Sequence, residues 1–107
     1  MLIICPCTGN TLAKMALGIT DTPVTMAAKA HLRCDRPLLI ALATNDGLSA
    51  NLSNLNAMQK RKSVYFVPLT QDDPEKKPHS LVCDFGKLSE SFYAALRGEQ
   101  LRPLFRN

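Results

Sequence analysis

The residues best suited to chemistry lie in a polar turn near the start of the chain, Cys5–Thr11. Side chains of Thr8, Asn10 and Thr11 can donate and accept hydrogen bonds, and Gly9 lets the backbone approach a ligand closely. The turn joins the end of an apolar strand to the start of an amphipathic helix. Ligands bind at such junctions in α/β sheets, where the helix start favours an anion. The alternative is that Thr8 or Asn10 only caps the helix.

A second polar turn, Thr44–Gly47, follows another apolar run. Within this turn, Asn45 and Asp46 offer an amide and a carboxylate at the end of a strand. Asparagine is unfavourable inside helices, yet the following helical segment contains three of them: Asn51, Asn54 and Asn56. This excess indicates polar contacts near the start of that helix, unless these residues belong to a solvated face.

The longest loop of the chain is Gln71–Ser80, in which prolines and mixed charges oppose regular structure. It carries two adjacent cations, Lys76 and Lys77. The loop is either a solvated connector or a functional segment, because loops of this length in compact domains are often functional.

The elements that must position these residues alternate along the chain. Apolar runs predict strands over residues 2–4, 38–43 and 63–67, and apolar residues at helical spacing predict helices beginning near Leu12, Pro23, Leu48 and Leu88. Gly18 is expected to end the first helix, and Thr22 to cap the second, with Pro23 at its first position. Alternation of this kind predicts one α/β domain over residues 1–107, with a three-layer, doubly wound parallel sheet. The order of strands and helices is that of the second half of such a domain, and it leaves both edges of the sheet exposed.

Composition narrows the class of protein. Hydrophobic residues make up 46% of the chain, which excludes disorder, and aromatic residues only 6%, which favours helices packed on a sheet. The net charge of +4 fits an anionic substrate or cofactor, whereas the scattered positions of the basic residues argue against nucleic-acid binding. No apolar run approaches the roughly 18 residues of a membrane span, so we expect a cytoplasmic chain.

The four cysteines are expected to be reduced in that compartment. Cys34 and Cys83 are expected to be small buried hydrophobic residues. No CxxC pair or nearby histidine completes a zinc pattern, so no metal site is predicted.

Several of these motifs resemble a known family. The sequence TGNTLAK at Thr8–Lys14, followed by DTPV at Asp21–Val24 and MAAKA at Met26–Ala30, resembles the flavoprotein superfamily of flavin-containing cysteine decarboxylases and prenyl-flavin synthases. The resemblance covers nearly all of this chain but only the C-terminal half or so of the family's chain. It implies a Rossmann/flavodoxin-like fold.

Within that superfamily, the second turn and the long loop are similar to the B subunits of dipicolinate synthase, above all QDDP at Gln71–Pro74 and KKP at Lys76–Pro78. Decarboxylase members carry a PxMN motif, and the Asn of this motif binds a substrate carboxylate. Asn45 stands at the position of that Asn, but Leu42 and Thr44 replace its Pro and Met, which weakens the case for decarboxylation.

The resemblance implies a site for flavin mononucleotide (FMN) formed by Thr8, Gly9, Asn10, Thr11 and Asn45, and substrate contacts from Asn45, Asp46, Lys76 and Lys77. It identifies no catalytic residue. It also implies a role in forming pyridine-2,6-dicarboxylate during sporulation, as part of an oxidoreductase that acts on a small dicarboxylate. The nicotinamide-dependent A subunit of dipicolinate synthase would be the partner, and a homo-oligomer the assembly. The alternative is a non-catalytic assembly subunit that has lost flavin binding.

Overall fold

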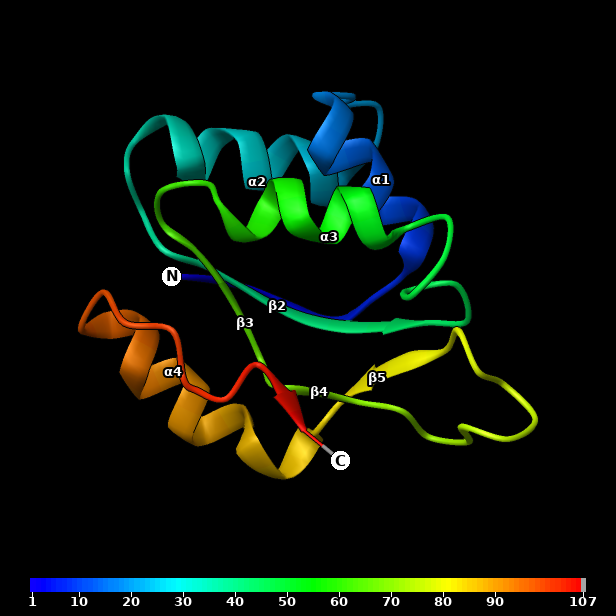
Figure 1. The fold of residues 1–107 in the computed structure, drawn as a ribbon. Coiled ribbons are helices and arrows are strands. Elements are labelled where there is room, and N and C mark those ends of the chain that lie inside the picture. Colours follow the sequence, from blue (N-terminus) through cyan, green and yellow to red (C-terminus); the bar gives the residue numbers. More distant parts are fainter. Residues whose placement is uncertain (107) are drawn as a thin grey trace.

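The fold has three layers, seen here in a computed structural model that describes residues 1–106 (Figure 1). Six strands form the sheet: β1 (Leu2–Cys7), β2 (Leu38–Thr44), β3 (Val64–Phe66), β4 (Leu69–Thr70), β5 (Leu81–Cys83) and β6 (Phe105–Arg106). The helices are α1 (Gly9–Leu17), α2 (Pro23–Arg33), α3 (Leu52–Gln59) and α4 (Leu88–Leu96), with a 3₁₀ turn, η1 (Phe85–Lys87), before α4. Helices α1, α2 and α3 cover one face of the sheet, and α4 covers the other.

Strand β2 is the centre of the sheet. It pairs in parallel with β1 on one side, and on the other side with β3 in parallel and then with β5 in antiparallel orientation. Its residues from Leu38 to Leu42 are fully buried. A continuous apolar run is what a strand covered on both faces requires, because side chains on both of its sides must leave water.

The helix boundaries follow local signals in the sequence. Gly18 ends α1 in the left-handed conformation, with a φ of 75°. Thr22 caps α2, accepting a hydrogen bond from the N–H of Thr25, while Thr25 in turn accepts from the N–H of Thr22. Pro23 follows at the first helical position, as its fixed φ favours. These predicted boundaries of α1 and α2 are confirmed.

The predicted α/β class with three layers is confirmed, but the sheet is mixed and has six strands. The long loop joins two short antiparallel strands, β4 and β5, and the C-terminal β6 adds in parallel to β4. Strands β4, β5 and β6 have only two or three residues each, too few to show an apolar alternation, and the sequence did not predict them. Strand β3 is equally short, but it lies within the longer run at residues 63–67 that was predicted. The residues after α4 are partly covered by the rest of the chain: Leu104 is buried, whereas Phe105 is exposed.

The two sides of the sheet's parallel part differ in how they are closed. Among residues 1–106, β1 pairs with β2 alone, so its outer edge is open. Beside β3, the side chain of Gln100 takes the place of a strand. Its amide donates to the carbonyl of Phe66 at 2.6 Å and accepts from the N–H of Phe66 at 2.7 Å.

We predict that Gln100→Ala lowers the free energy of unfolding by about 2 kcal/mol, because it removes both partners of a buried backbone unit. Urea unfolding followed by circular dichroism measures this change. The matched control is Glu99→Ala, since Glu99 only forms an exposed pair with Arg97 and should cost under about 0.5 kcal/mol. Equal stability of the two variants would contradict the role given to Gln100.

Candidate functional site

The two polar turns meet at one end of the sheet, because β1 and β2 are parallel neighbours and finish on the same side (Figure 1). Gly9, the first residue of α1, lies directly against Thr44 and Asn51. A Cβ atom on Gly9 would come within 2.7 Å of Asn51 Nδ2, and nearer still to Thr44 Oγ1. No side chain fits there. The groups that approach the backbone of Gly9 closely are therefore Thr44 and Asn51 of the same chain.

Thr8 is the N-cap of α1. Its hydroxyl accepts a hydrogen bond from the N–H of Thr11 at 3.2 Å and donates one to Thr11 Oγ1 at 3.1 Å. The capping interpretation is thus confirmed for Thr8. The N–H groups of Gly9 and Asn10 have no hydrogen-bond partner among residues 1–106. They point from the positive end of the helix dipole, where an anion or a polar ring edge is favoured.

Asp46 organises the second turn from within. One of its carboxylate oxygens accepts hydrogen bonds from Thr44 Oγ1 at 2.6 Å and from Asn51 Nδ2 at 2.9 Å. Asn54 Nδ2 donates to Asn51 Oδ1 and so extends the network. The hydrogen bond from Asn51, and then that from Thr44, lowers the pKa of Asp46 below its ordinary value of 3.8. The contacts expected near the start of α3 therefore exist for Asn51 and Asn54.

Asn10 and Asn45 differ from these residues because both side chains are exposed. Neither makes a side-chain hydrogen bond to another residue within 1–106. One amide follows β1 and the other follows β2, so both stand at the shared end of the two strands. Each can donate and accept, which suits a ligand that carries carbonyl oxygens and ring nitrogens.

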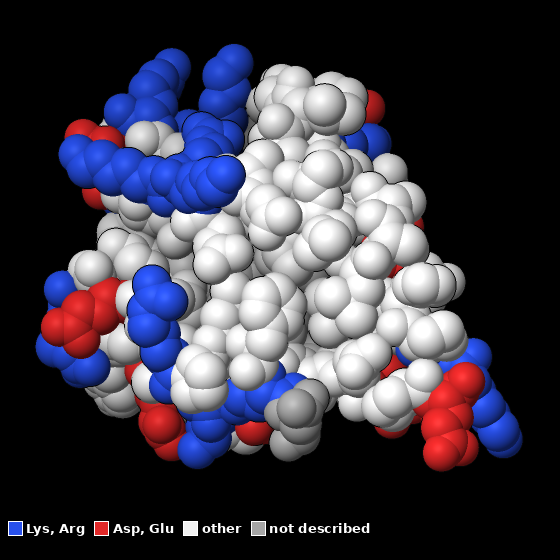
Figure 2. Space-filling model, viewed as in Figure 1, with Lys and Arg blue, Asp and Glu red and all other residues white. Residues whose placement is uncertain are grey.

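The long loop is attached to the second turn only at its base. Ser80 Oγ donates to the carbonyl of Thr44 at 3.3 Å, and the carbonyl of His79 accepts from the N–H of Leu48 at 2.9 Å. Beyond that base, the loop projects past the sheet and exposes charged groups (Figures 1 and 2). Lys76 and Lys77 are exposed, and within residues 1–106 no side-chain contact joins them to either turn.

The sequence did not identify two of the residues that shape this end of the sheet. Ser80 was one of ten loop residues with no signal of its own, because its partner Thr44 is far away in the chain. Gly47 is buried against Leu81, where an added Cβ would lie 2.7 Å from a side-chain carbon. Its turn was predicted, but the close packing was not.

The cysteines divide into two kinds. Cys7 and Cys83 are buried, and burial raises the pKa of the Cys7 thiol to about 12 and that of Cys83 to about 11. Cys5 and Cys34 are exposed. The expectation of burial is therefore confirmed for Cys83 and wrong for Cys34, which follows the last turn of α2 and faces solvent.

Neither a metal cluster nor a membrane-spanning helix is found in the described part of the chain. Among residues 1–106, no three side chains of His, Cys, Asp or Glu come together as metal ligands. Within the same residues, no helix is both long and apolar enough to cross a membrane.

The fold and the paired turns place this chain in a known class. Residues 1–94 match the Flavoprotein family, and the chain belongs to that family. Its sequence is 43% identical over 103 residues to the B subunit of dipicolinate synthase from Bacillus subtilis (strain 168), a match that covers 96% of this chain and 52% of that protein.

Solved structures agree with this placement. The crystal structure of the B subunit of dipicolinate synthase from Bacillus halodurans C superposes with a TM-score of 0.95 at 43% identity, covering 98% of this chain and 54% of that one. The FMN-dependent cysteine decarboxylase SpaF shares the fold, with a TM-score of 0.61 at 23% identity over 91% of this chain and 51% of that one. The chain thus spans about half the length of the relatives that it matches.

We predict that Asp46→Asn destabilises the chain by about 1 kcal/mol at pH 7, because hydrogen bonds to an ionised acceptor are stronger than those to a neutral one. Folding lowers the pKa of Asp46, so its stabilisation is present above 3.8 and is lost as the pH falls through the lower, folded-state pKa. Urea unfolding at several pH values should show the difference from wild type shrinking below about pH 4. Asp35→Asn, at an exposed ion pair, is the control and should change little at any pH. A difference for Asp46→Asn that stays constant down to pH 2 would contradict the assignment.

We also predict that a thiol reagent modifies Cys5 and Cys34 quickly, and Cys7 and Cys83 only after unfolding, because thiolates are the reactive form and burial disfavours them. Absorbance of the released chromophore follows the reaction. Cys5→Ser and Cys34→Ser should each remove one fast equivalent. Four fast equivalents in the folded chain would contradict the burial of the other two thiols.

Proposed function

We propose that this chain binds FMN at the end of β1 and β2 and acts as the B component of a dipicolinate synthase. The proposal is carried by two exposed side-chain amides, Asn10 and Asn45, which stand beside a helix start in a chain of the Flavoprotein family. Amides there can pair with the polar edge of a flavin ring, and the N–H groups of Gly9 and Asn10 can bind its carbonyl or phosphate oxygens.

The structure supports different roles for the residues of this proposed site. Thr8 and Thr11 hold the helix start in place through the N-cap, and Gly9 keeps the two turns in contact. Asn10 and Asn45 are then the residues that would touch the flavin itself. A bound flavin supplies two-electron transfer, and the residues of the chain bind and orient it.

On the substrate side, we propose a small dicarboxylate such as pyridine-2,6-dicarboxylate or its precursor. The Asn45 amide can donate to one carboxylate. Asp46 is itself an acceptor and already engaged by Thr44 and Asn51, so its part is to fix the position of Asn45 next to it. Lys76 and Lys77 on the neighbouring loop are the cations that would contact a substrate carboxylate directly. The loop as a whole carries no net positive charge, because it also contains Asp72, Asp73 and Glu75.

The proposed partners follow from the relatives. Two proteins similar to this chain are each named as the B subunit of dipicolinate synthase, which supports a role in sporulation and a complex with the A subunit of that enzyme. The open edge of β1 supports association between copies of this chain, since an unpaired strand edge is a template for pairing. Because the chain spans about half of each relative, the activity of the whole enzyme is part of the proposal.

An FMN titration, followed by quenching of flavin fluorescence, tests the binding step. We expect saturable binding, weakened about five- to thirtyfold by Asn10→Ala or Asn45→Ala, which corresponds to about 1–2 kcal/mol for a lost hydrogen bond. Asn56→Ala is the matched control, because Asn56 is an exposed asparagine on α3 with no side-chain hydrogen bond to residues 1–106.

Two outcomes would count against the proposal. Equal affinity of the wild type, Asn10→Ala and Asn45→Ala would remove both amides from the flavin site. No binding by a chain whose circular dichroism shows it folded would favour the assembly role, which co-purification with the A subunit of dipicolinate synthase would then test.

A further inference from the structure

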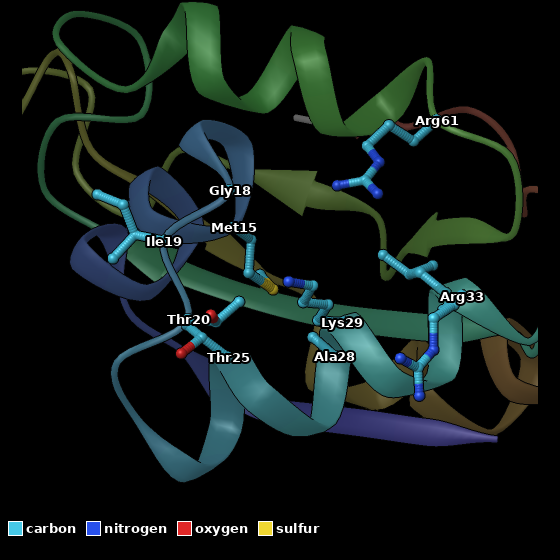
Figure 3. A pocket seen from close by; sticks show the side chains of 10 residues that line it. Met15, Gly18, Ile19, Thr20, Thr25, Ala28, Lys29, Arg33 and Arg61 are labelled. Atoms are coloured by element: carbon cyan, nitrogen blue, oxygen red, sulfur yellow. The ribbon is translucent and has the colours of Figure 1, made fainter.

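A second hollow lies in the helical layer, away from the two turns. Helix α1 packs between α2 and α3 and ends at Gly18, so the space beyond its end is not filled by a helix. The result is a pocket of about 290 Å³ (Figure 3). This volume is near the lower end of the range found for small-molecule sites, so only a small ligand fits.

The inner surface of this pocket is largely apolar. Met15 and Ala28 are buried in its floor, and Ile19 and Leu32 contribute further aliphatic surface. A small inorganic anion would leave that surface in contact with water. An organic body would cover it, and the sulfur of Met15 is well suited to the edge of an aromatic ring.

The rim of the pocket is basic. Lys29 and Arg33 come from α2, and Arg61 comes from the segment after α3. In Figure 3 the side chains of Lys29 and Arg61 extend toward the hollow from different elements, while the guanidinium of Arg33 points away. None of the three forms a salt bridge with a carboxylate of residues 1–106.

The same end of the molecule gathers positive charge on its surface. Figure 2 shows Lys and Arg side chains clustered where α2 ends and the chain passes from α3 to β3. The neighbouring Lys62 is paired with Asp35, but the two cations that extend toward the pocket form no such pair within residues 1–106. Unpaired cations around an apolar hollow favour a negatively charged ligand with an apolar body.

We propose that this pocket binds a small aromatic carboxylate, with the ring on Met15 and the carboxylate groups on Lys29 and Arg61. A planar guanidinium can pair with a carboxylate in bidentate fashion or stack on the ring. The residues of this site are distinct from Thr8–Thr11 and Asn45, so the inference stands apart from the proposed flavin site. Both cations are exposed, so we expect a dissociation constant on the order of 0.1–1 mM.

Amide NMR of the ¹⁵N-labelled chain, titrated with benzene-1,3-dicarboxylate, tests the inference. We expect saturable shifts at Gly18, Ile19 and Lys29, with Asn45 unmoved. Benzene-1,3-dicarboxamide, which has the ring without the charge, and inorganic phosphate, which has the charge without the ring, should each bind at least threefold more weakly. Binding of phosphate as tight as that of the dicarboxylate would overturn the assignment of an aromatic ligand.

The variants separate this pocket from the general positive charge of the surface. Arg61→Gln and Lys29→Gln should each weaken binding at least threefold, since each removes one charge that faces the ligand. Lys60→Gln makes the same change in net charge one residue away from Arg61, but Lys60 does not line the pocket, and affinity should be unchanged. Equal weakening by Lys60→Gln, or an absence of shifts at 10 mM ligand, would overturn the proposal.

Discussion

The structure depends on the pairing of β2. Its side chains from Leu38 to Leu42 are fully buried, so its backbone N–H and carbonyl groups must form hydrogen bonds with neighbouring strands on both sides. Three strands provide this pairing, with β1 on one side and with β3 followed by β5 on the other. An unpaired backbone group in the core costs more than a typical hydrogen bond contributes, so these partners are obligatory. The change from parallel to antiparallel pairing along one side of β2 brings the long loop to the end of the sheet where the two turns lie.

At that end, the residues divide into those that hold the turns and those that face outward. The holding residues are joined to one another: Gly9 fits against Thr44 and Asn51, and Asp46 accepts from both of them. The outward residues, Asn10 and Asn45, have exposed amides. Pre-positioning of this kind reduces the ordering that a ligand would otherwise impose on its site. A turn built only from exposed polar side chains would lack this rigidity.

Local signals in the sequence predicted much of this arrangement. The caps at Thr8 and Thr22, the stop at Gly18 and the buried run of β2 each depend on neighbouring residues, and the structure has them where they were expected. Both turns, and their common side of the sheet, follow from the order of strands and helices. The resemblance to flavoproteins agrees with the family match over residues 1–94.

The features that sequence reasoning missed depend on distant partners. The contact of Ser80 with Thr44 and that of Gln100 with Phe66 join residues more than thirty positions apart. A serine in a polar loop and a glutamine after a helix carry no local signal of such contacts. The exposure of Cys34 depends on where α2 ends relative to the sheet. Separating the capping role of Thr8 from the outward position of Asn10 also needed the three-dimensional structure.

The side chain of Gln100 and the buried Leu104 have a consequence for synthesis. Both lie in the last part of the described chain, yet they complete the sheet beside β3 and β4. Domains form while the chain emerges from the ribosome, and residues are added at about 5–20 per second. For as long as the stretch after α4 is still within the ribosomal tunnel, the backbone of Phe66 lacks its partner. Any β3 that pairs with β2 before Gln100 emerges therefore has an edge that is open to chaperones and to neighbouring nascent chains.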